Sequence, residues 1–311
     1  VWHRDHPISD EGVLQSQRLR EKIRQARCQG HDHFHSESEE DMPRRPEEET
    51  RIRRFYDRFL ESTQSIYCSP LLRALQTAHF ALSDQDGWGS IKLLKEAREH
   101  FNWVLQRDCL GTDTGSNLVD RAVTMSKSLL SEAETDQLET RVDASDCEEK
   151  WWSDDPETEA DVDRRLQELW RRLLDDDAED SCILVTHSNL IKALLMRFGG
   201  VEHSLLALRA EDVACDVASP STVASEEEDG YHCLTSEGGA SWQVVDSGPQ
   251  DLQRLKVERL QNCGVLGLRC VLEAPLEDGL EDWLDLSTPE KNASRWVAKD
   301  ALLMFDSVLV K

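Results

Sequence analysis

The sequence contains 311 residues, and its 62 acidic side chains against 36 basic ones give a formal charge of −26. A field of that sign repels phosphate backbones and anionic lipid headgroups, so the charge argues against nucleic acid and membrane partners. Only 39% of the residues are hydrophobic while 32% are charged, which predicts a folded domain interrupted by acidic, solvated segments.

The first predicted element is a helix over residues 9–27, which Ser9 caps and in which apolar residues recur at helical spacing. Residues 29–51 are polar, acidic and contain proline, so we expect a long loop or insertion there. A second helix is expected over residues 51–62. The apolar run at residues 65–68 then predicts a short strand.

Ser69 and Pro70 form a cap and first-turn pair, which predicts that a helix over residues 70–82 begins directly after the strand. Residues 91–106 form an apolar stretch that we expect to be partly helical. Residues 111–117 are rich in Gly, Thr and Asp, a composition typical of a loop.

The strongest helical pattern covers residues 158–174, where apolar residues recur on one face. The run at residues 182–185 has the composition of a short buried strand. A polar turn over residues 186–189 joins it to a helix expected at residues 190–198. Strand again runs into helix through a polar turn.

The last third of the chain is less regular. Residues 209–250 are rich in Ser, Glu, Asp and Gly, so we expect a second acidic insertion there. Residues 265–272 read as a strand. The C-terminal extension, residues 275–311, begins acidic and is expected to end in a helix capped by Thr288 with Pro289 in its first turn.

Two strands that each lead straight into a helix are typical of an α/β sheet with parallel strands. We therefore predict a three-layer α/β/α domain with a mostly parallel sheet over residues 1–274, followed by the extension. In such folds, ligands bind beyond the carboxyl ends of the strands. The two strand-to-helix junctions are accordingly the candidate sites.

Each junction carries a side chain suited to phosphate. Arg73 lies in the first turn of its helix, where backbone N–H groups and the helix dipole also favour an anion. His187 lies where the second strand ends, and an imidazole there can donate to a phosphoryl oxygen. The two together predict a phosphate pocket, although either alone is more often an ordinary solvated or structural side chain.

The segments around these two residues resemble the histidine phosphatase superfamily, with its phosphoglycerate mutase-like fold. SPLLRALQTA is similar to the family's second-arginine motif, and ILVTHSNLIKALL to its second-histidine motif. Two segments, Trp151 to Asp155 and Leu260 to Val265, resemble features of the eukaryotic phosphomutase-like branch. Further similar segments follow in family order, namely Asp5 to Gln15, Leu94 to Phe101, Trp151 to Asp155 and Leu260 to Val265.

The resemblance implies phosphoryl transfer through a covalent phosphohistidine. Carried onto this sequence, Arg73 is the second pocket arginine that binds phosphate, and His187 is the second histidine, which binds phosphate and assists catalysis. Glu99 is the expected proton donor to the leaving oxygen, with Glu96 as the weaker candidate. No metal or organic cofactor is implied, and the partner is a small phosphorylated substrate or a phosphoprotein.

One family motif is missing. The superfamily's nucleophile lies in an R-H-G triplet at the end of a first strand, and this triplet occurs nowhere in the sequence. His3 and His6 fall after the position of that strand, so we assign them no catalytic role. The expected first strand would precede Asp5, and the chain does not begin with Met, so we predict an N-terminally truncated form.

Two functional hypotheses remain. The first is a phosphomonoester hydrolase whose nucleophile lies upstream of this sequence, and the second is a non-catalytic phosphate-binding or interaction module, a pseudophosphatase. The first strand lies in the centre of the family's sheet, so losing it predicts marginal stability.

The remaining features of the sequence give weaker indications of location, metal binding and modification. No long apolar run or leader is present, and the nine scattered cysteines favour reduced thiols, so we predict a cytoplasmic protein. His31, His33 and His35 lie in an acidic loop and are interpreted as at most an adventitious metal site. Asn292 fits a glycosylation acceptor without a secretory context to support it.

Overall fold

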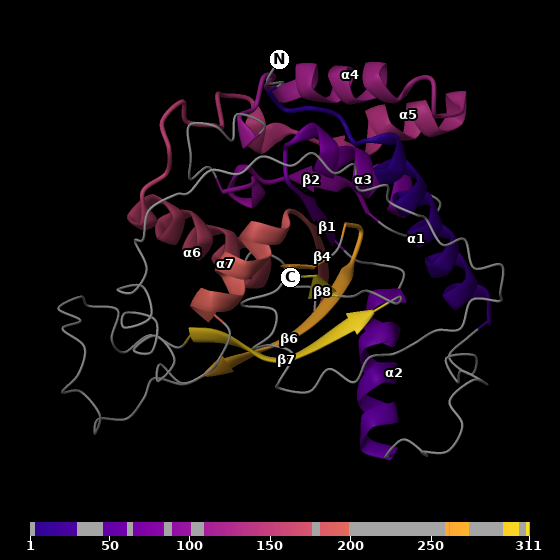
Figure 1. The fold of residues 1–311 in the computed structure, drawn as a ribbon, viewed down its shortest axis with the longest axis vertical. Coiled ribbons are helices and arrows are strands. Elements are labelled where there is room, and N and C mark those ends of the chain that lie inside the picture. Colours follow the sequence, from indigo (N-terminus) through magenta and orange to yellow (C-terminus); the bar gives the residue numbers. More distant parts are fainter. Residues whose placement is uncertain are drawn as a thin grey trace, which may run out of the picture.

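The computed structural model of the protein is shown in Figure 1. It describes residues 4–29, 46–60, 65–83, 89–100, 109–175, 181–198, 259–260, 262–273, 295–304 and 309–310.

A four-stranded sheet forms the centre of the molecule. Its strands are β1 (Ser65–Cys68), β2 (Ile91–Leu93), β3 (Val142–Asp143) and β4 (Cys182–Val185), in the order β3-β2-β1-β4. Every pairing between them is parallel. The α/β prediction with a parallel sheet is thereby confirmed.

Alternating side chains of β1 divide the core between the two faces of the sheet. Ile66 and Cys68 belong to one buried cluster, whereas Tyr67 belongs to another. The same alternation holds in β4, where Ile183 and Val185 pack against the first cluster and neighbouring residues against the second. Helices therefore cover both faces, which gives the predicted three layers.

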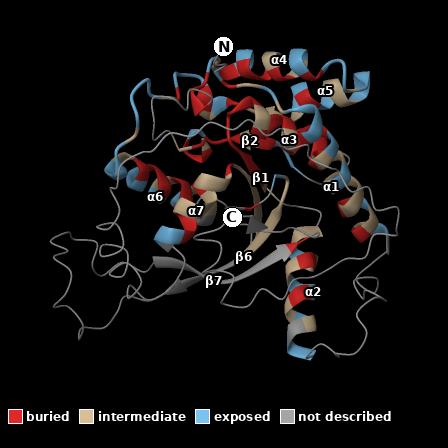
Figure 2. Ribbon diagram, viewed as in Figure 1, coloured by how far each residue is buried: buried red, intermediate tan, exposed pale blue. Residues whose placement is uncertain are grey.

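The first cluster is covered by helices from the N-terminal half. These are α1 (Asp10–Gln29), α2 (Pro46–Leu60), α3 (Leu72–Leu82), α4 (Gly115–Ser126) and α5 (Glu132–Arg141). Figure 2 shows how burial concentrates around β1, β2 and α3, while the outer surfaces of α4 and α5 are exposed.

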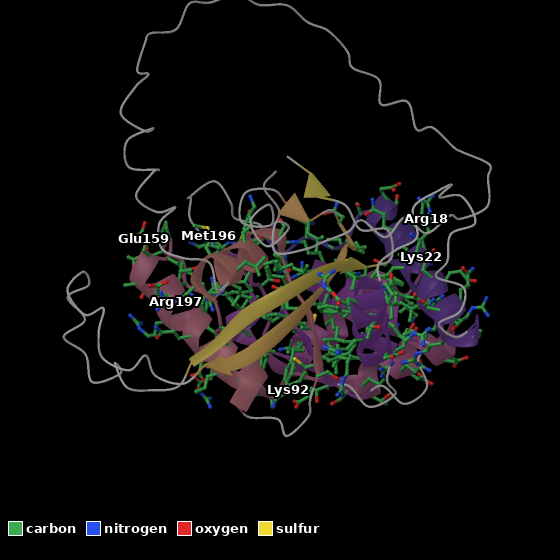
Figure 3. The ribbon with its side chains drawn as sticks, turned by 90° about the horizontal axis from the view of Figure 1, so that it is seen from below. Arg18, Lys22, Lys92, Glu159, Met196 and Arg197 are labelled. Atoms are coloured by element: carbon green, nitrogen blue, oxygen red, sulfur yellow. The ribbon has the colours of Figure 1, made fainter. Side chains whose placement is uncertain are left out.

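The second cluster is covered by α6 (Glu159–Asp175) and α7 (Ser188–Phe198). The apolar stripe of α6, including Val162, Leu166 and Leu169, packs against the sheet as its sequence pattern predicts. Its opposite face is polar, and Figure 3 shows Glu159 of α6 and Arg197 of α7 at the periphery.

The C-terminal strands form two further sheets that are not bonded to the parallel sheet. β6 (Val265–Glu273) pairs with β7 (Arg295–Met304) in antiparallel fashion, and β5 (Arg259–Leu260) pairs with β8 (Leu309–Val310). The predicted strand at residues 265–272 is thus present. The helix expected near the C-terminus is wrong for residues 295–304, because this stretch bonds to β6 as a strand.

Several boundaries differ from prediction. α2 begins at Pro46, inside the expected insertion. The apolar run from Ile91 supplies strand β2 and a short 3-10 helix, η2 (Lys95–Ala97), because Ile91 and Leu93 bury the same face beside β1. The predicted loop over residues 111–117 ends early, since α4 begins at Gly115.

The short strand β3 and a further 3-10 helix, η4 (Ser145–Cys147), were not anticipated. Residues 30–45, most of the first insertion, and residues 209–250 lie outside the described residues, as do Thr288 and Pro289. The domain division at residue 274 stays a prediction, and the β6–β7 ladder crosses it.

Candidate functional site

The pairing of β1 with β4 brings the two strand-to-helix junctions together. Cys68 lies opposite Val185 in the parallel register, and the backbone N–H of Ser69 donates to the carbonyl of Val185 at 2.9 Å. One step further, Ser69 Oγ and His187 Nε2 share a hydrogen bond of 2.8 Å. His187 therefore lies against the turn that leads into α3.

His187 occupies the N-terminus of α7. Its carbonyl accepts the N–H of Ile191 at 3.0 Å, and its side chain is only 8% exposed. Burial lowers the pKa of the imidazole well below its usual value, and the charges of Arg73 and Arg165 lower it further. The resting imidazole is therefore neutral and carries one donor and one acceptor nitrogen.

Arg73 is the second residue of α3 and is half-buried. Its charge lowers the pKa of His187, and also that of Asp5, which places the guanidinium in electrostatic reach of both side chains. The structure thus brings Arg73 and His187 into one region.

The start of α3 differs from the prediction. The helix begins at Leu72, and its N-cap residue Leu71 makes no side-chain cap, so the expected cap by Ser69 and Pro70 is wrong. Ser69 Oγ does accept the N–H of Leu71, at 3.3 Å, but Asp5 Oδ1 accepts the N–H of Leu72 at 2.7 Å. These amides are already satisfied, so an incoming anion depends on the cationic side chains instead.

Asp5 is a buried carboxyl that the sequence interpretation did not single out. It has a φ of 41°, is 2% exposed, and its Oδ2 lies 3.3 Å from Arg121 Nη1, while Arg121 Nη2 donates to its carbonyl at 2.8 Å. Burial raises the pKa of Asp5 to about 6, against the opposing effects of Leu72, Arg121 and Arg73. Asp5 fixes the helix start that carries Arg73.

The two acid candidates have different surroundings. Glu99 is 8% exposed, and its Oε1 accepts the N–H of His100 at 2.8 Å, while Oε2 lies 3.5 Å from the Asn189 amide of α7. Glu96 instead pairs with Arg172 of α6 at 3.1 Å. Glu99 therefore faces the turn that carries His187, whereas Glu96 is occupied in a structural ion pair.

A family comparison adds to this geometry. Residues 120–229 match the model of the histidine phosphatase superfamily, branch 1. This match supports the resemblance of the chain to the histidine phosphatase superfamily. The matched stretch includes β4, His187 and α7, and it begins after Arg73 and Glu99 in the chain. No curated protein and no solved structure gives a match.

Another residue of the second-arginine motif is structural. Gln76 is 1% exposed; its Oε1 accepts the N–H of Ile8 at 2.8 Å, and its Nε2 donates to Ser126 Oγ at 2.9 Å. It links the N-terminal segment to α4. The motif therefore combines a candidate phosphate-binding residue, Arg73, with a residue that stabilises the fold, Gln76.

The other histidines considered in the sequence lie in the N-terminal segment or outside the described residues. His6 lies in the N-terminal segment, where its Nδ1 is 2.9 Å from the Pro7 carbonyl; His3, His31, His33 and His35 lie outside the described residues. The described part of the chain contains no group of three His, Cys, Asp or Glu side chains that could hold a metal ion. Among its helices, none is long and apolar enough to cross a membrane.

Proposed function

We propose that this domain binds the phosphoryl group of a phosphomonoester between Arg73 and His187. In its complete form it hydrolyses the ester through a phosphohistidine. The observation that carries the proposal is the hydrogen bond between His187 and Ser69, which ties the imidazole to the turn before Arg73. A guanidinium and a neutral imidazole in one region provide donors for a tetrahedral oxyanion.

Glu99 serves as the proton donor in this proposal. Its carboxyl is buried beside the turn of His187, and it is held by the His100 amide. A bound phosphoryl group adds negative charge nearby, which favours the protonated carboxyl and suits it to protonate the leaving oxygen. The ion pair of Glu96 with Arg172 supports Glu99 over Glu96.

The nucleophile is supplied from outside the 311 residues. An imidazole attacks phosphorus as the ester oxygen leaves with the proton of Glu99, and water then cleaves the P–N bond. Within the described residues, β4 pairs with β1 on one side and with no strand on the other. A further parallel strand that paired with this outer edge of β4 would end beside His187.

The second candidate is a non-catalytic phosphate-binding module. The observation in its favour is the absence of an R-H-G triplet from the sequence. The same pocket then binds inorganic phosphate or a phosphoprotein without turnover. In either case we place the protein in the cytoplasm, with a small phosphorylated substrate or a phosphoprotein as its partner.

Calorimetric titration with inorganic phosphate tests the shared pocket. We expect the wild-type chain to bind phosphate and Arg73→Ala to weaken that binding at least about tenfold, as the loss of one charge-assisted contact implies. Arg164→Ala is the matched control, because Arg164 is exposed and pairs only locally with Asp161. Equal phosphate affinity in wild type and Arg73→Ala would refute the pocket.

Hydrolysis of an aryl phosphate separates the two candidates. The chain extended by its upstream reading frame should release phosphate and form an acid-labile phosphohistidine if the first candidate is right. Binding without turnover by that longer chain, or an upstream frame without an R-H-G strand, leaves the non-catalytic module.

A further inference from the structure

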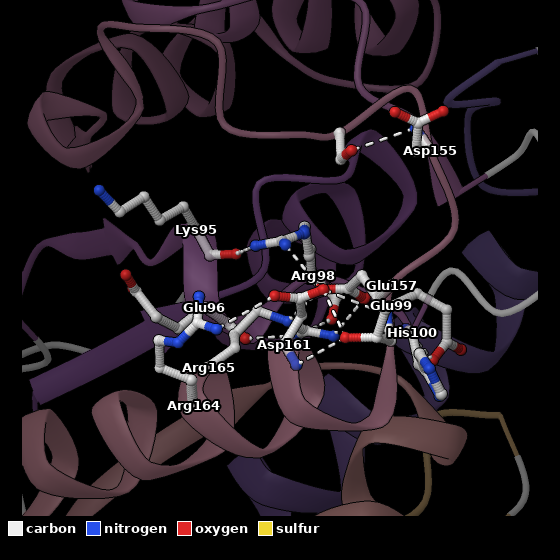
Figure 4. Close-up of polar contacts among 12 residues, drawn as sticks. Lys95, Glu96, Arg98, Glu99, His100, Asp155, Glu157, Asp161, Arg164 and Arg165 are labelled. Carbon is white, nitrogen blue, oxygen red and sulfur yellow. Dashed lines mark hydrogen bonds and ion pairs between the residues drawn. The ribbon is translucent and has the colours of Figure 1, made fainter.

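A buried arginine of α6 holds the loop that carries Glu99. Arg165 is 6% exposed, and its Nε and Nη2 donate to the two carboxylate oxygens of Glu157, both at 2.8 Å. Its Nη1 donates to the carbonyls of Glu96 and Arg98, at 2.8 Å and 2.9 Å. Figure 4 shows these contacts converging on the loop.

Arg98 completes the arrangement from the loop side. Its Nη2 donates to Glu157 Oε1 at 2.7 Å, and its Nη1 donates to the carbonyl of Lys95 at 2.9 Å. We call Glu157, Arg165 and Arg98 the Glu157 clamp. Three backbone carbonyls just before Glu99 are thus bonded to guanidinium groups that share one carboxylate.

The clamp and its loop are connected to the pocket in three ways. The carbonyl of Arg98 is the last backbone group before Glu99, so fixing it fixes where the Glu99 side chain starts. Arg165 also acts electrostatically on His187, which it approaches from α6 while Arg73 acts from α3. Thr186 Oγ1 donates to the Ala97 carbonyl at 2.7 Å, which ties the same loop to the turn of His187.

We propose that Arg165 is a positioning residue that holds Glu99 in register with His187. This inference rests on the proposed function, because it gives Glu99 a role beside a bound phosphoryl group. The bidentate pair with Glu157 sets the plane of the guanidinium, and that plane directs its remaining donors at the two carbonyls. A lysine keeps the charge but not this geometry.

Hydrogen exchange tests the positioning without any ligand. The N–H of His100 donates to Glu99 Oε1, so its protection reports the placement of the Glu99 carboxyl. In Arg165→Lys we expect the protection of His100 to fall about tenfold relative to Tyr67 of β1, as loss of one charge-assisted hydrogen bond implies. Arg164→Lys, its exposed neighbour, should leave that ratio unchanged.

A double-mutant cycle on phosphate affinity tests the connection to Glu99. Arg165→Lys should weaken phosphate binding by about fivefold to tenfold in the wild-type background and much less in Glu99→Gln. A merely structural Arg165 would lower the melting temperature and weaken binding equally in both backgrounds. Glu157→Gln provides a milder variant that should act in the same direction, should Arg165→Lys fail to fold.

The outcomes separate this inference from the proposed function. If wild type binds no phosphate while the His100 protection ratio falls in Arg165→Lys, the pocket fails and the positioning of Glu99 stands. If phosphate binds but the His100 ratio is unchanged in both Arg165→Lys and Glu157→Gln, the positioning role is overturned. The positioning role would also be overturned if Arg165→Lys weakened phosphate binding equally in the wild-type and Glu99→Gln backgrounds.

Discussion

Strands β1 and β4 pair residue for residue, yet their surroundings differ. Ile66 of β1 lies opposite Ile183 of β4, and both side chains point to the same core cluster. Ile66 is 0% exposed, whereas Ile183 and the rest of β4 are half-buried. The chemistry of the two residues is identical, so their environments alone account for the difference.

This difference shows where the sheet is incomplete among the described residues. β1 has a strand on each side, whereas β4 has a partner on only one. The apolar composition of β4 suits a strand with neighbours on both sides. The candidate site therefore combines an enclosed half, built on β1 and α3, with a half built on β4, whose outer edge pairs with no strand among the described residues.

The largest expected effect comes from the matched isoleucines. Ile66→Ala should lower the free energy of unfolding by about 3–4 kcal/mol, and Ile183→Ala by only about 1–2 kcal/mol, because the second removes less buried surface. Urea unfolding of both variants measures the difference. Similar losses would show that β4 is as enclosed as β1 and would contradict the unpaired edge.

The comparison extends to stability at acid pH through a buried histidine in α3, the helix that follows β1. His79 of α3 is 1% exposed, its Nε2 has no hydrogen-bond partner among the described residues, and burial lowers its pKa to about 4. A histidine with a lowered folded pKa stabilises the fold above its ordinary value of 6.5, and this stability is lost as the pH falls towards 4.

Between pH 7 and pH 5, the free energy of unfolding should therefore fall by about 2 kcal/mol less in His79→Gln than in wild type. Urea unfolding at the two pH values checks this. Contributions from His187, which has the same sign, and from Asp5, whose raised pKa has the opposite sign, are common to both proteins and cancel in the comparison. Parallel pH curves would contradict the account.

The smallest expected effect concerns the hydroxyl that joins the two junctions. Ser69→Ala removes the bond to His187 and the acceptor of the Leu71 N–H, and should cost about 1–2 kcal/mol of unfolding free energy. It should also weaken phosphate binding, because the imidazole loses its anchor. Ser116→Ala on the exposed surface of α4 is the control and should change stability by less than about 0.5 kcal/mol.

Parts of the fold follow from local sequence patterns. The strands at residues 65–68 and 182–185 and the helix α6 have strong apolar signals, and the structure confirms all three. β3 has only two residues, and α5 has a weak apolar face, so local patterns gave little indication of either. The C-terminal strand β7 depends on pairing with β6, which no local pattern reveals.

In the candidate site, too, some features follow from local sequence patterns and others depend on contacts between distant residues. Motif residues Arg73 and His187 were accessible from the sequence, because each follows a recognisable strand. The cap of α3 by Asp5 was not, since the two partners are separated by 67 positions. The helical spacing of Val162, Leu166 and Leu169 places Arg165 nearer the buried face of α6 than Arg164, but no local pattern reveals which groups Arg165 contacts.

The central claim is that Arg73 and His187 bind one phosphate together. Its most direct test is the Cε1–H signal of His187 in NMR spectra recorded during titration with inorganic phosphate. We expect the signal to shift saturably in wild type and to stay fixed in Arg73→Ala at the same phosphate concentrations. A His187 signal that does not respond in wild type, or that responds equally without Arg73, would contradict the account.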